Sequence, residues 1–162
     1  MKYLYWVIGI VLLAGVLYWA YKTPTKVVPV SETETVYVFM TRMTQTDMEY
    51  VPVEREVAKT NVIEDLIKET LTELIKGPTA EEKESGLSVS FNAGTIVNYV
   101  KIEGDTLMVD FNEVFDTPMG GSARVTSISQ GLLRTIEQFP LDGVTGIQFT
   151  VNNGKRTAVL EP

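Results

Sequence analysis

The sequence predicts an α+β domain with the element order ββαββαβ(β), a two-layer sandwich in which one sheet carries both helices on one face. It also predicts one N-terminal transmembrane helix. An uncharged apolar run extends from Tyr3 to Tyr21. Two later segments, 63–75 and 122–139, repeat apolar residues at helical spacing, and short β-branched runs lie in pairs around them. Paired strands separated by helices are typical of α+β domains.

The apolar run Tyr3–Tyr21 is long enough to cross a membrane. As a helix it spans roughly 28 Å at about 1.5 Å per residue, close to a hydrocarbon thickness of about 30 Å. A cleavable signal peptide, the main alternative, has a shorter apolar region that ends in small residues. The run has no polar face, which disfavours a soluble core helix. Aromatic residues at both ends predict anchors at the two membrane interfaces: Tyr3, Tyr5, Trp6, Tyr18, Trp19 and Tyr21.

Three parts of the chain follow from this run. We expect a membrane anchor over residues 1–22, a proline-containing stalk over 23–34 and a folded domain over 35–162. Basic residues on the two sides of the anchor are nearly balanced, so charge does not set the orientation. A short N-terminal tail before a long domain favours a single-pass cell-membrane protein whose C-terminal domain is extracytoplasmic.

The folded part begins with two predicted strands, 35–40 and 49–57, which are rich in β-branched and aromatic residues. Pro52 has no N–H to donate, so the second strand is expected at a sheet edge or at a bulge. A helix follows over 63–75, capped by Thr60 or Asn61 and ended by Gly77-Pro78.

The second half of the domain is predicted to contain a hairpin, a second helix and two more strands. Residues 79–85 read as a short exposed helical turn or a loop, and a hairpin is predicted over 95–102 and 106–111. Ser122 is placed to cap the second helix, which ends before Pro140. A strand over 144–151 and a short final strand over 157–160 complete the order.

Composition excludes several classes of function. The chain has 162 residues, a formal net charge of −7, no cysteine and no histidine. An acidic protein repels nucleic acid, so no nucleic-acid partner is expected. Without cysteine or histidine there is no disulfide scaffold, thiol nucleophile, lipidated cysteine or Ser-His arrangement. We predict no cofactor, no metal ion, no small-molecule substrate and no enzymatic activity.

Carboxylates provide the main chemical alternative. Asp110, Glu113 and Asp116 lie close together in sequence, and such a group could act in a glycan hydrolase or bind calcium. Phe111 and Phe115 interrupt the spacing that a calcium loop needs, so a polar strand face is favoured. Gly120-Gly121-Ser122 precedes a helix, but it lacks the lysine of a phosphate-binding loop and reads as an entry loop.

Four segments resemble one known family. They are Val51–Val57, the helix end Leu71–Lys76 with Gly77-Pro78-Thr79, the strand Leu107–Asn112, and Phe139–Val144. In this order and spacing they are similar to the GerMN domain of the sporulation and spore germination family, over roughly Val36 to Val159. The motif residues carried by the resemblance are Gly77, Pro78, Thr79, Asp110, Phe111, Asn112, Gly120 and Gly121.

The resemblance implies a fold similar to ring-building-motif domains, a place outside the cytoplasmic membrane, and protein assembly rather than catalysis. The family's namesake helps to build a channel complex between mother cell and forespore. This chain differs in holding one such domain and a membrane helix in place of a lipidated cysteine. A role in sporulation or germination and a general cell-envelope role are both compatible with it. The expected partners are copies of itself or other envelope proteins.

Overall fold

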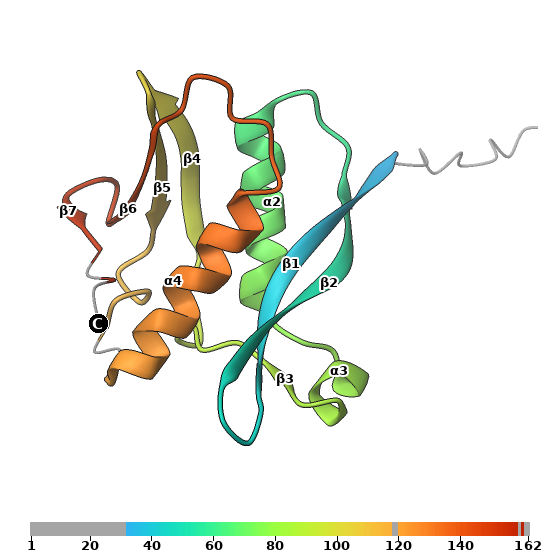
Figure 1. Ribbon diagram of the computed structural model, residues 1–162. Coiled ribbons are helices and arrows are strands. Elements are labelled where there is room, and N and C mark those ends of the chain that lie inside the picture. Colours follow the sequence, from blue (N-terminus) through green and yellow to red (C-terminus); the bar gives the residue numbers. More distant parts are fainter. Residues whose placement is uncertain (1–31, 118–119, 159, 161–162) are drawn as a thin grey trace, which may run out of the picture. The chain divides into compact units, whose positions relative to one another are not determined.

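The fold begins with a long antiparallel hairpin (Figure 1). The computed structural model describes residues 32–117, 120–158 and 160. Strand β1, Thr33–Met43, pairs with β2, Met48–Ala58, without a register shift from Thr33↔Ala58 to Met43↔Met48. Both predicted strands are confirmed and are longer at each end, because the polar residues that flank them continue the same ladder.

Pro52 lies in an edge strand, as predicted. The first sheet has the order β2-β1-β3, in which β3 is only Leu87–Ser88. Pro52 is opposite Phe39, whose N–H donates away from β2 to Thr135 Oγ1 at 3.0 Å. The pair Phe39–Pro52 is therefore a non-hydrogen-bonded pair, and the missing N–H of Pro52 faces outward, where it removes no bond from the ladder.

Two helices follow the hairpin. Helix α2, Ile63–Lys76, buries Ile67, Leu71 and Leu74, and α3, Ala80–Glu84, forms the predicted exposed turn. The predicted N-cap of α2 was wrong by one or two residues, whereas the predicted stop at Gly77-Pro78 is confirmed. The N-cap is Val62, which has no side-chain cap, and Thr60 Oγ1 instead accepts from the N–H of Val62 at 3.2 Å, just outside the helix.

The second sheet has four strands in the order β4-β5-β6-β7. The predicted hairpin is β4, Val97–Glu103, with β5, Thr106–Phe111. Helix α4, Ser122–Ile136, crosses back so that β6, Gly146–Val151, lies parallel to β5. The last strand, β7, is shorter than predicted and covers only Arg156–Thr157.

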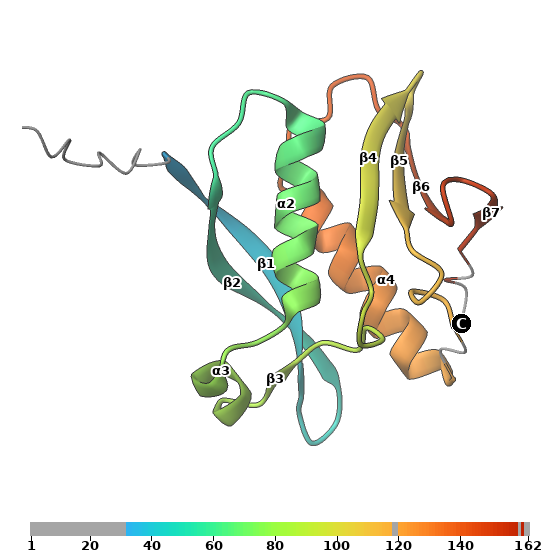
Figure 2. The same ribbon diagram turned by 180° about the vertical axis from the view of Figure 1, so that it is seen from behind.

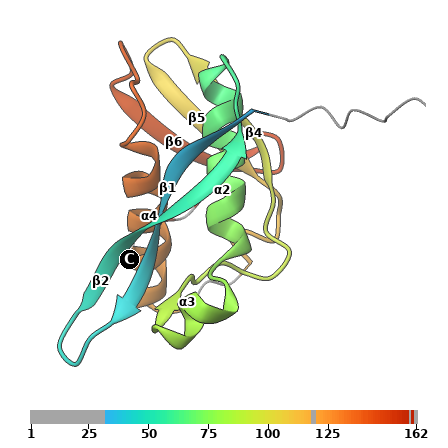
Figure 3. The ribbon, with the colours of Figure 1, turned by 90° about the vertical axis from the view of Figure 1, so that its right-hand side faces the viewer.

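The prediction of one sheet with both helices on one face was wrong. The described residues form two sheets, and helices α2 and α4 lie between them (Figures 1 and 2). Helix α2 contacts β1 and β2 on one side and β4 on the other. Figure 3 shows the β1–β2 hairpin crossing the helices on the side away from β4, β5 and β6. The helices therefore share one core with both sheets.

The physical reason lies in α4, which has two buried stripes. Val125, Ile128, Leu132 and Ile136 form the apolar stripe that the sequence indicated. A second stripe of small residues, Ser127, Gly131 and Thr135, is also buried, and a Cβ on Gly131 would lie 3.2 Å from the carbonyl oxygen of Phe39. Only small side chains allow the β1 backbone to approach the helix so closely. A helix with two such sides packs between two sheets.

The predicted membrane anchor, Tyr3–Tyr21, lies outside the described residues, as do its six aromatic interface anchors. Within the part of the chain that is described, no helix has both the length and the apolar character needed to cross a membrane.

Candidate functional site

The family motif Gly77-Pro78-Thr79 joins α2 to α3. Thr79 is the N-cap of α3, and its Oγ1 accepts from the N–H of Glu82 at 3.3 Å. Glu82 Oε2 accepts in return from the N–H of Thr79 at 2.8 Å, which completes a capping box. Gly77 has φ +79°, and a Cβ there would lie 3.0 Å from Val89 Cγ2. The motif therefore turns the chain and starts the next helix.

Glu82 also binds the edge strand β2. Arg55 donates to it through both terminal nitrogens, Nη1 to Oε1 at 2.8 Å and Nη2 to Oε2 at 2.7 Å. The hydrogen bonds from Arg55 lower the pKa of Glu82 from 4.5 to about 2, although partial burial opposes this. The same bonds raise the pKa of Arg55. Such bidentate pairs fix position as well as charge, so the pair holds α3 against β2.

Replacing Glu82 with glutamine is expected to lower the free energy of unfolding by about 1–2 kcal/mol at pH 7, because a charge-assisted pair becomes a neutral one. The folded-state pKa is about 2, below the ordinary 4.5. The stabilisation is therefore present above about pH 4.5 and is lost as the pH falls toward 2. Urea unfolding of the full chain in mild detergent should show a deficit at pH 7 that shrinks by pH 3. A deficit independent of pH would contradict the ion pair.

The second motif, Asp110-Phe111-Asn112, lies at the end of β5. Asp110 is fully buried and accepts four hydrogen bonds. Asn98 Nδ2 donates to Oδ2 at 2.8 Å, and Thr150 Oγ1 donates to Oδ1 at 2.7 Å. The backbone N–H groups of Asn153 and Gly154 donate at 2.9 and 2.7 Å. Burial raises the pKa of Asp110, but these four donors outweigh it and hold the pKa below its usual value.

The two backbone donors come from an unusual turn between β6 and β7. Asn152 and Asn153 have φ values of +57° and +59°, a left-handed conformation that asparagine tolerates better than most residues. Two consecutive N–H groups in such a turn form a small concave anion site. Here the anion is the protein's own carboxylate, Asp110, so the turn is held against β5.

Glu113 and Asp116 bind the same turn and the strand that follows it. Glu113 Oε1 accepts from Asn152 Nδ2, and Asp116 accepts from both terminal nitrogens of Arg156. We call Asp110, Glu113 and Asp116 the turn-binding carboxylates. Asp110 and Glu113 bind the β6–β7 turn, and Asp116 binds Arg156 at the start of β7. In the described residues no three acidic, histidine or cysteine side chains converge as a metal site would require. All three carboxylates are thus bound by side chains or backbone of the same region, which they stabilise.

The other residues of this motif are structural as well. Phe111 is fully buried and stacks on Phe115, with ring centroids 4.0 Å apart and an interplanar angle of 8°. Asn112 Nδ2 donates to the carbonyl oxygen of Gly94 at 2.8 Å, and Asn112 Oδ1 accepts from the N–H of Ile96 at 3.2 Å. Asn112 therefore extends the β4–β5 pairing beyond the end of β5.

Gly120 and Gly121 precede α4, as predicted, with φ values of +36° and +91°. The predicted cap was wrong by one residue, since Gly121 is the N-cap and Ser122 is the first helical residue. The cap has no side-chain hydrogen bond. No atom of the described residues lies within 4 Å of a Cβ built at either glycine, so the positive φ values explain why glycine is used there.

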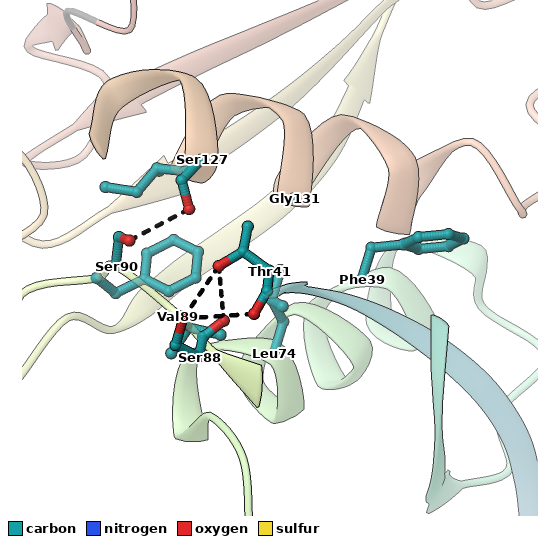
Figure 4. Close-up of a pocket in the computed structure, with 10 residues that line it drawn as sticks. Phe39, Thr41, Leu74, Ser88, Val89, Ser90, Ser127 and Gly131 are labelled. Carbon is teal, nitrogen blue, oxygen red and sulfur yellow. Dashed lines mark hydrogen bonds between the residues drawn. The ribbon is translucent and has the colours of Figure 1, made fainter. Parts of the chain in front are cut away.

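Sequence reasoning missed a hydroxyl-lined cavity between β1, the β3 segment and α4 (Figure 4). It holds about 10 Å³, which is close to the space of one water molecule. Thr41 Oγ1 donates to the carbonyl oxygen of Ser88 at 2.9 Å, and the Oγ atoms of Ser90 and Ser127 are 3.2 Å apart. The small polar residues of α4 were the available signal. The cavity is too small for any substrate.

A larger hollow, about 520 Å³, lies where α4 ends beside β6. Its lining is mostly apolar and includes Leu133, Phe139, Val144 and Ile147, with Glu137 as the charged member. No cluster of hydrogen-bonding side chains enters it, so it offers an apolar surface without groups for chemistry.

Comparison with known proteins agrees with the family resemblance. The family model Germane, described as sporulation and spore germination, matches residues 16–157. The search of curated proteins found no match. Among solved structures, the tandem GerMN domains of the sporulation protein GerM from Bacillus subtilis match with TM-score 0.57 and 20% identity. That match covers 85% of this chain and 48% of the other, so the chain spans about half the length of the tandem structure.

The first GerMN domain of the same Bacillus subtilis protein, solved alone, matches with TM-score 0.55 and 20% identity. It covers 76% of this chain and 86% of that domain. At 20% identity the two solved structures show only that the fold is shared, whereas the family model shows that this chain belongs to the family. The resemblance stated from the sequence motifs is confirmed, and the chain belongs to the sporulation and spore germination family with a GerMN-like domain.

Proposed function

We propose that this chain is a membrane-anchored, extracytoplasmic assembly module of the cell envelope that binds other proteins and catalyses no reaction. Its partners are copies of itself or other envelope proteins. Family membership supports a role in sporulation or germination. The aromatic-flanked apolar run Tyr3–Tyr21 supports the anchor and the single-pass topology.

The observation that carries the proposal is that the acidic side chains in and beside the motif segments are already bound within the protein. Glu82 and the turn-binding carboxylates are bound to donors on the protein's own β2, β6–β7 turn and β7. A general acid or a nucleophile must instead be free to reach a substrate. These carboxylates therefore hold loops and strands in place, which supports a role as a binding surface in a protein assembly.

The carboxylate alternative, a glycan hydrolase or calcium-dependent glycan binder, would use Asp110, Glu113 and Asp116. It requires that calcium or a sugar displace the donors of all three side chains. Addition of calcium to the full chain is expected to leave the melting temperature unchanged within about 1 °C. A clear rise that Asp110→Asn abolishes would favour the alternative.

Membrane fractionation, protease treatment and cross-linking test the proposal together. We expect the full chain to remain with membranes after washing with high salt and carbonate, and protease added to protoplasts to digest the domain. An amine-reactive cross-linker, which reacts with the lysine side chains, should yield cross-linked oligomers or hetero-complexes in membranes. Full protection from protease would contradict the topology, and monomer alone at every concentration would contradict assembly.

A further inference from the structure

The outer edge of β2, formed by Tyr50, Pro52, Glu54 and Glu56, is the open side of the hairpin sheet. The ladder fixes which residues face outward. Lys59 N–H donates to the carbonyl oxygen of Glu32 at 2.9 Å, so every second pair from there on is hydrogen-bonded between β1 and β2. The intervening residues, including Glu54 and Glu56, direct their backbone groups away from β1.

The opposite edge of the sheet is closed by the protein itself. Gln138 acts like a strand residue, accepting from the N–H of Tyr37 at 2.9 Å and donating to its carbonyl oxygen at 2.6 Å. Phe39 donates to Thr135, and Thr41 pairs with Ser88 of β3. Within residues 32–117, 120–158 and 160, nothing comparable pairs with the outer edge of β2. Only the Glu54 carbonyl is bound there, by Arg55 Nη1 at 2.9 Å.

Charge determines what this edge can accept. β2 carries Glu54 and Glu56 on this edge, while Glu49 lies 3.7 Å from Arg42 of β1. The one cation of β2, Arg55, is already bound by Glu82. Glu54 and Glu56 are exposed on one face of the edge. The other face carries Val53, which packs against the core, the Glu82-bound Arg55, and the buried Val57. A strand added beside β2 would place alternate side chains next to the carboxylates and next to the valines.

We infer that the outer edge of β2 binds an extended segment of a partner protein in which basic residues alternate with apolar ones. The backbone N–H groups of Glu54 and Glu56 supply hydrogen bonds, and their side chains select lysine or arginine. A second copy of the chain is a poor occupant, because antiparallel β2 pairs bring four or more glutamates together and place two prolines in the new ladder. The inference rests on the proposed function and deepens it.

A peptide test separates strand addition from simple charge attraction. The probe is a capped ten-residue peptide of alternating lysine and valine, titrated into the full chain in zwitterionic detergent. Its control has the same composition with the lysines grouped at one end. The alternating peptide should bind at least tenfold more tightly, and hydrogen exchange of the Glu54 and Glu56 amides should slow at least tenfold at saturation. Equal binding of the two peptides, or unchanged exchange, would overturn the inference.

Matched charge reversals locate the site. Glu54→Lys with Glu56→Lys should weaken binding at least tenfold, whereas Glu69→Lys with Glu84→Lys, exposed acids on α2 and α3, should change it less than twofold. Equal loss in both double variants would overturn the assignment. Slow exchange of the same amides at high protein concentration without peptide would assign the edge to a second copy. Membrane cross-links without peptide binding would refute the inference about the β2 edge but not the proposed function. Peptide binding without membrane cross-links would support the β2 site and contradict the proposed assembly function.

Discussion

Replacement of Asp110 with alanine is expected to lower the free energy of unfolding by about 3–4 kcal/mol. The change leaves four donors without an acceptor: the side chains of Asn98 and Thr150 and the N–H groups of Asn153 and Gly154. Buried donors without partners cost about 1–3 kcal/mol each, and water entering the vacated space offsets part of the loss. Urea unfolding of the full chain in mild detergent, followed by circular dichroism, measures the difference.

Two further variants test the cause of that loss. Asp110→Asn keeps the size but turns an NH2 group toward donors, so it should lose nearly as much stability as alanine. Asp142→Ala, at an exposed position after α4, should change stability by less than about 0.5 kcal/mol. The pKa of Asp110 is lowered on folding, so its contribution is present above the ordinary range of aspartate and is lost as the pH falls through the folded-state value. A wild-type excess over Asp110→Asn that grew on acidification would contradict this.

Replacement of Gly131 with leucine is expected to cost about 3 kcal/mol or more. Even a Cβ at this position would lie 3.2 Å from the carbonyl oxygen of Phe39, which is backbone and yields little. A larger side chain must separate α4 from β1, and with it the hydrogen bond from Phe39 N–H to Thr135. Overpacking of this kind typically costs 1–3 kcal/mol, and loss of the adjoining bonds adds to it.

The matched control is Gln130→Leu, one residue earlier on α4 and only partly buried. It adds an apolar side chain to the same helix at a position that is not fully buried, so it should change stability by less than about 1 kcal/mol. Amide exchange of Phe39 and Tyr37 should accelerate in Gly131→Leu and stay unchanged in the control. Equal destabilisation by both variants would mean that the close approach of α4 and β1 has no energetic weight.

Local patterns in the sequence were enough to identify most elements. The helical spacing of Ile67, Leu71 and Leu74 located α2, and the glycine turn before Thr106 located the β4–β5 hairpin. The edge position of Pro52 could be predicted because it depends on one residue alone. Proline has no backbone N–H, so it cannot complete the hydrogen bonds to strands on both sides. The capping residues of both helices were displaced by a residue or two, since several neighbours offered similar side chains.

The arrangement of the sheets depends on contacts between distant residues and could not be predicted in this way. The strand β5 pairs in parallel with β6, although the whole of α4 lies between them in sequence. In the described part of the chain, the short β3 is the one further strand of the β1–β2 sheet. The small-residue stripe of Ser127, Gly131 and Thr135 is visible in the sequence. Its role, to let the β1 backbone pack closely on α4, follows only from the folded structure.

The candidate site illustrates the same limit. The closeness of Asp110, Glu113 and Asp116 in sequence suggested a ligand-binding group. Two donors of Asp110 and the donors to Glu113 and Asp116 lie between Asn152 and Arg156, in the β6–β7 turn and the start of β7, about forty residues later. No local pattern in the sequence revealed these contacts. Gly77-Pro78-Thr79 was correctly read as a helix stop, while the bond from Arg55 of β2 to Glu82 required the fold.

The most direct test of the account is a pair of single cysteines introduced into the otherwise cysteine-free full chain in its native cells. Glu56→Cys lies at the outer edge of β2, and Glu84→Cys lies on α3 as the control. A membrane-impermeant maleimide should label both positions in protoplasts. A short thiol-to-amine cross-linker should form a protein adduct in membranes from Glu56→Cys and much less from Glu84→Cys. Labelling only after lysis, or equal adducts or none from both positions, would contradict an extracytoplasmic assembly module.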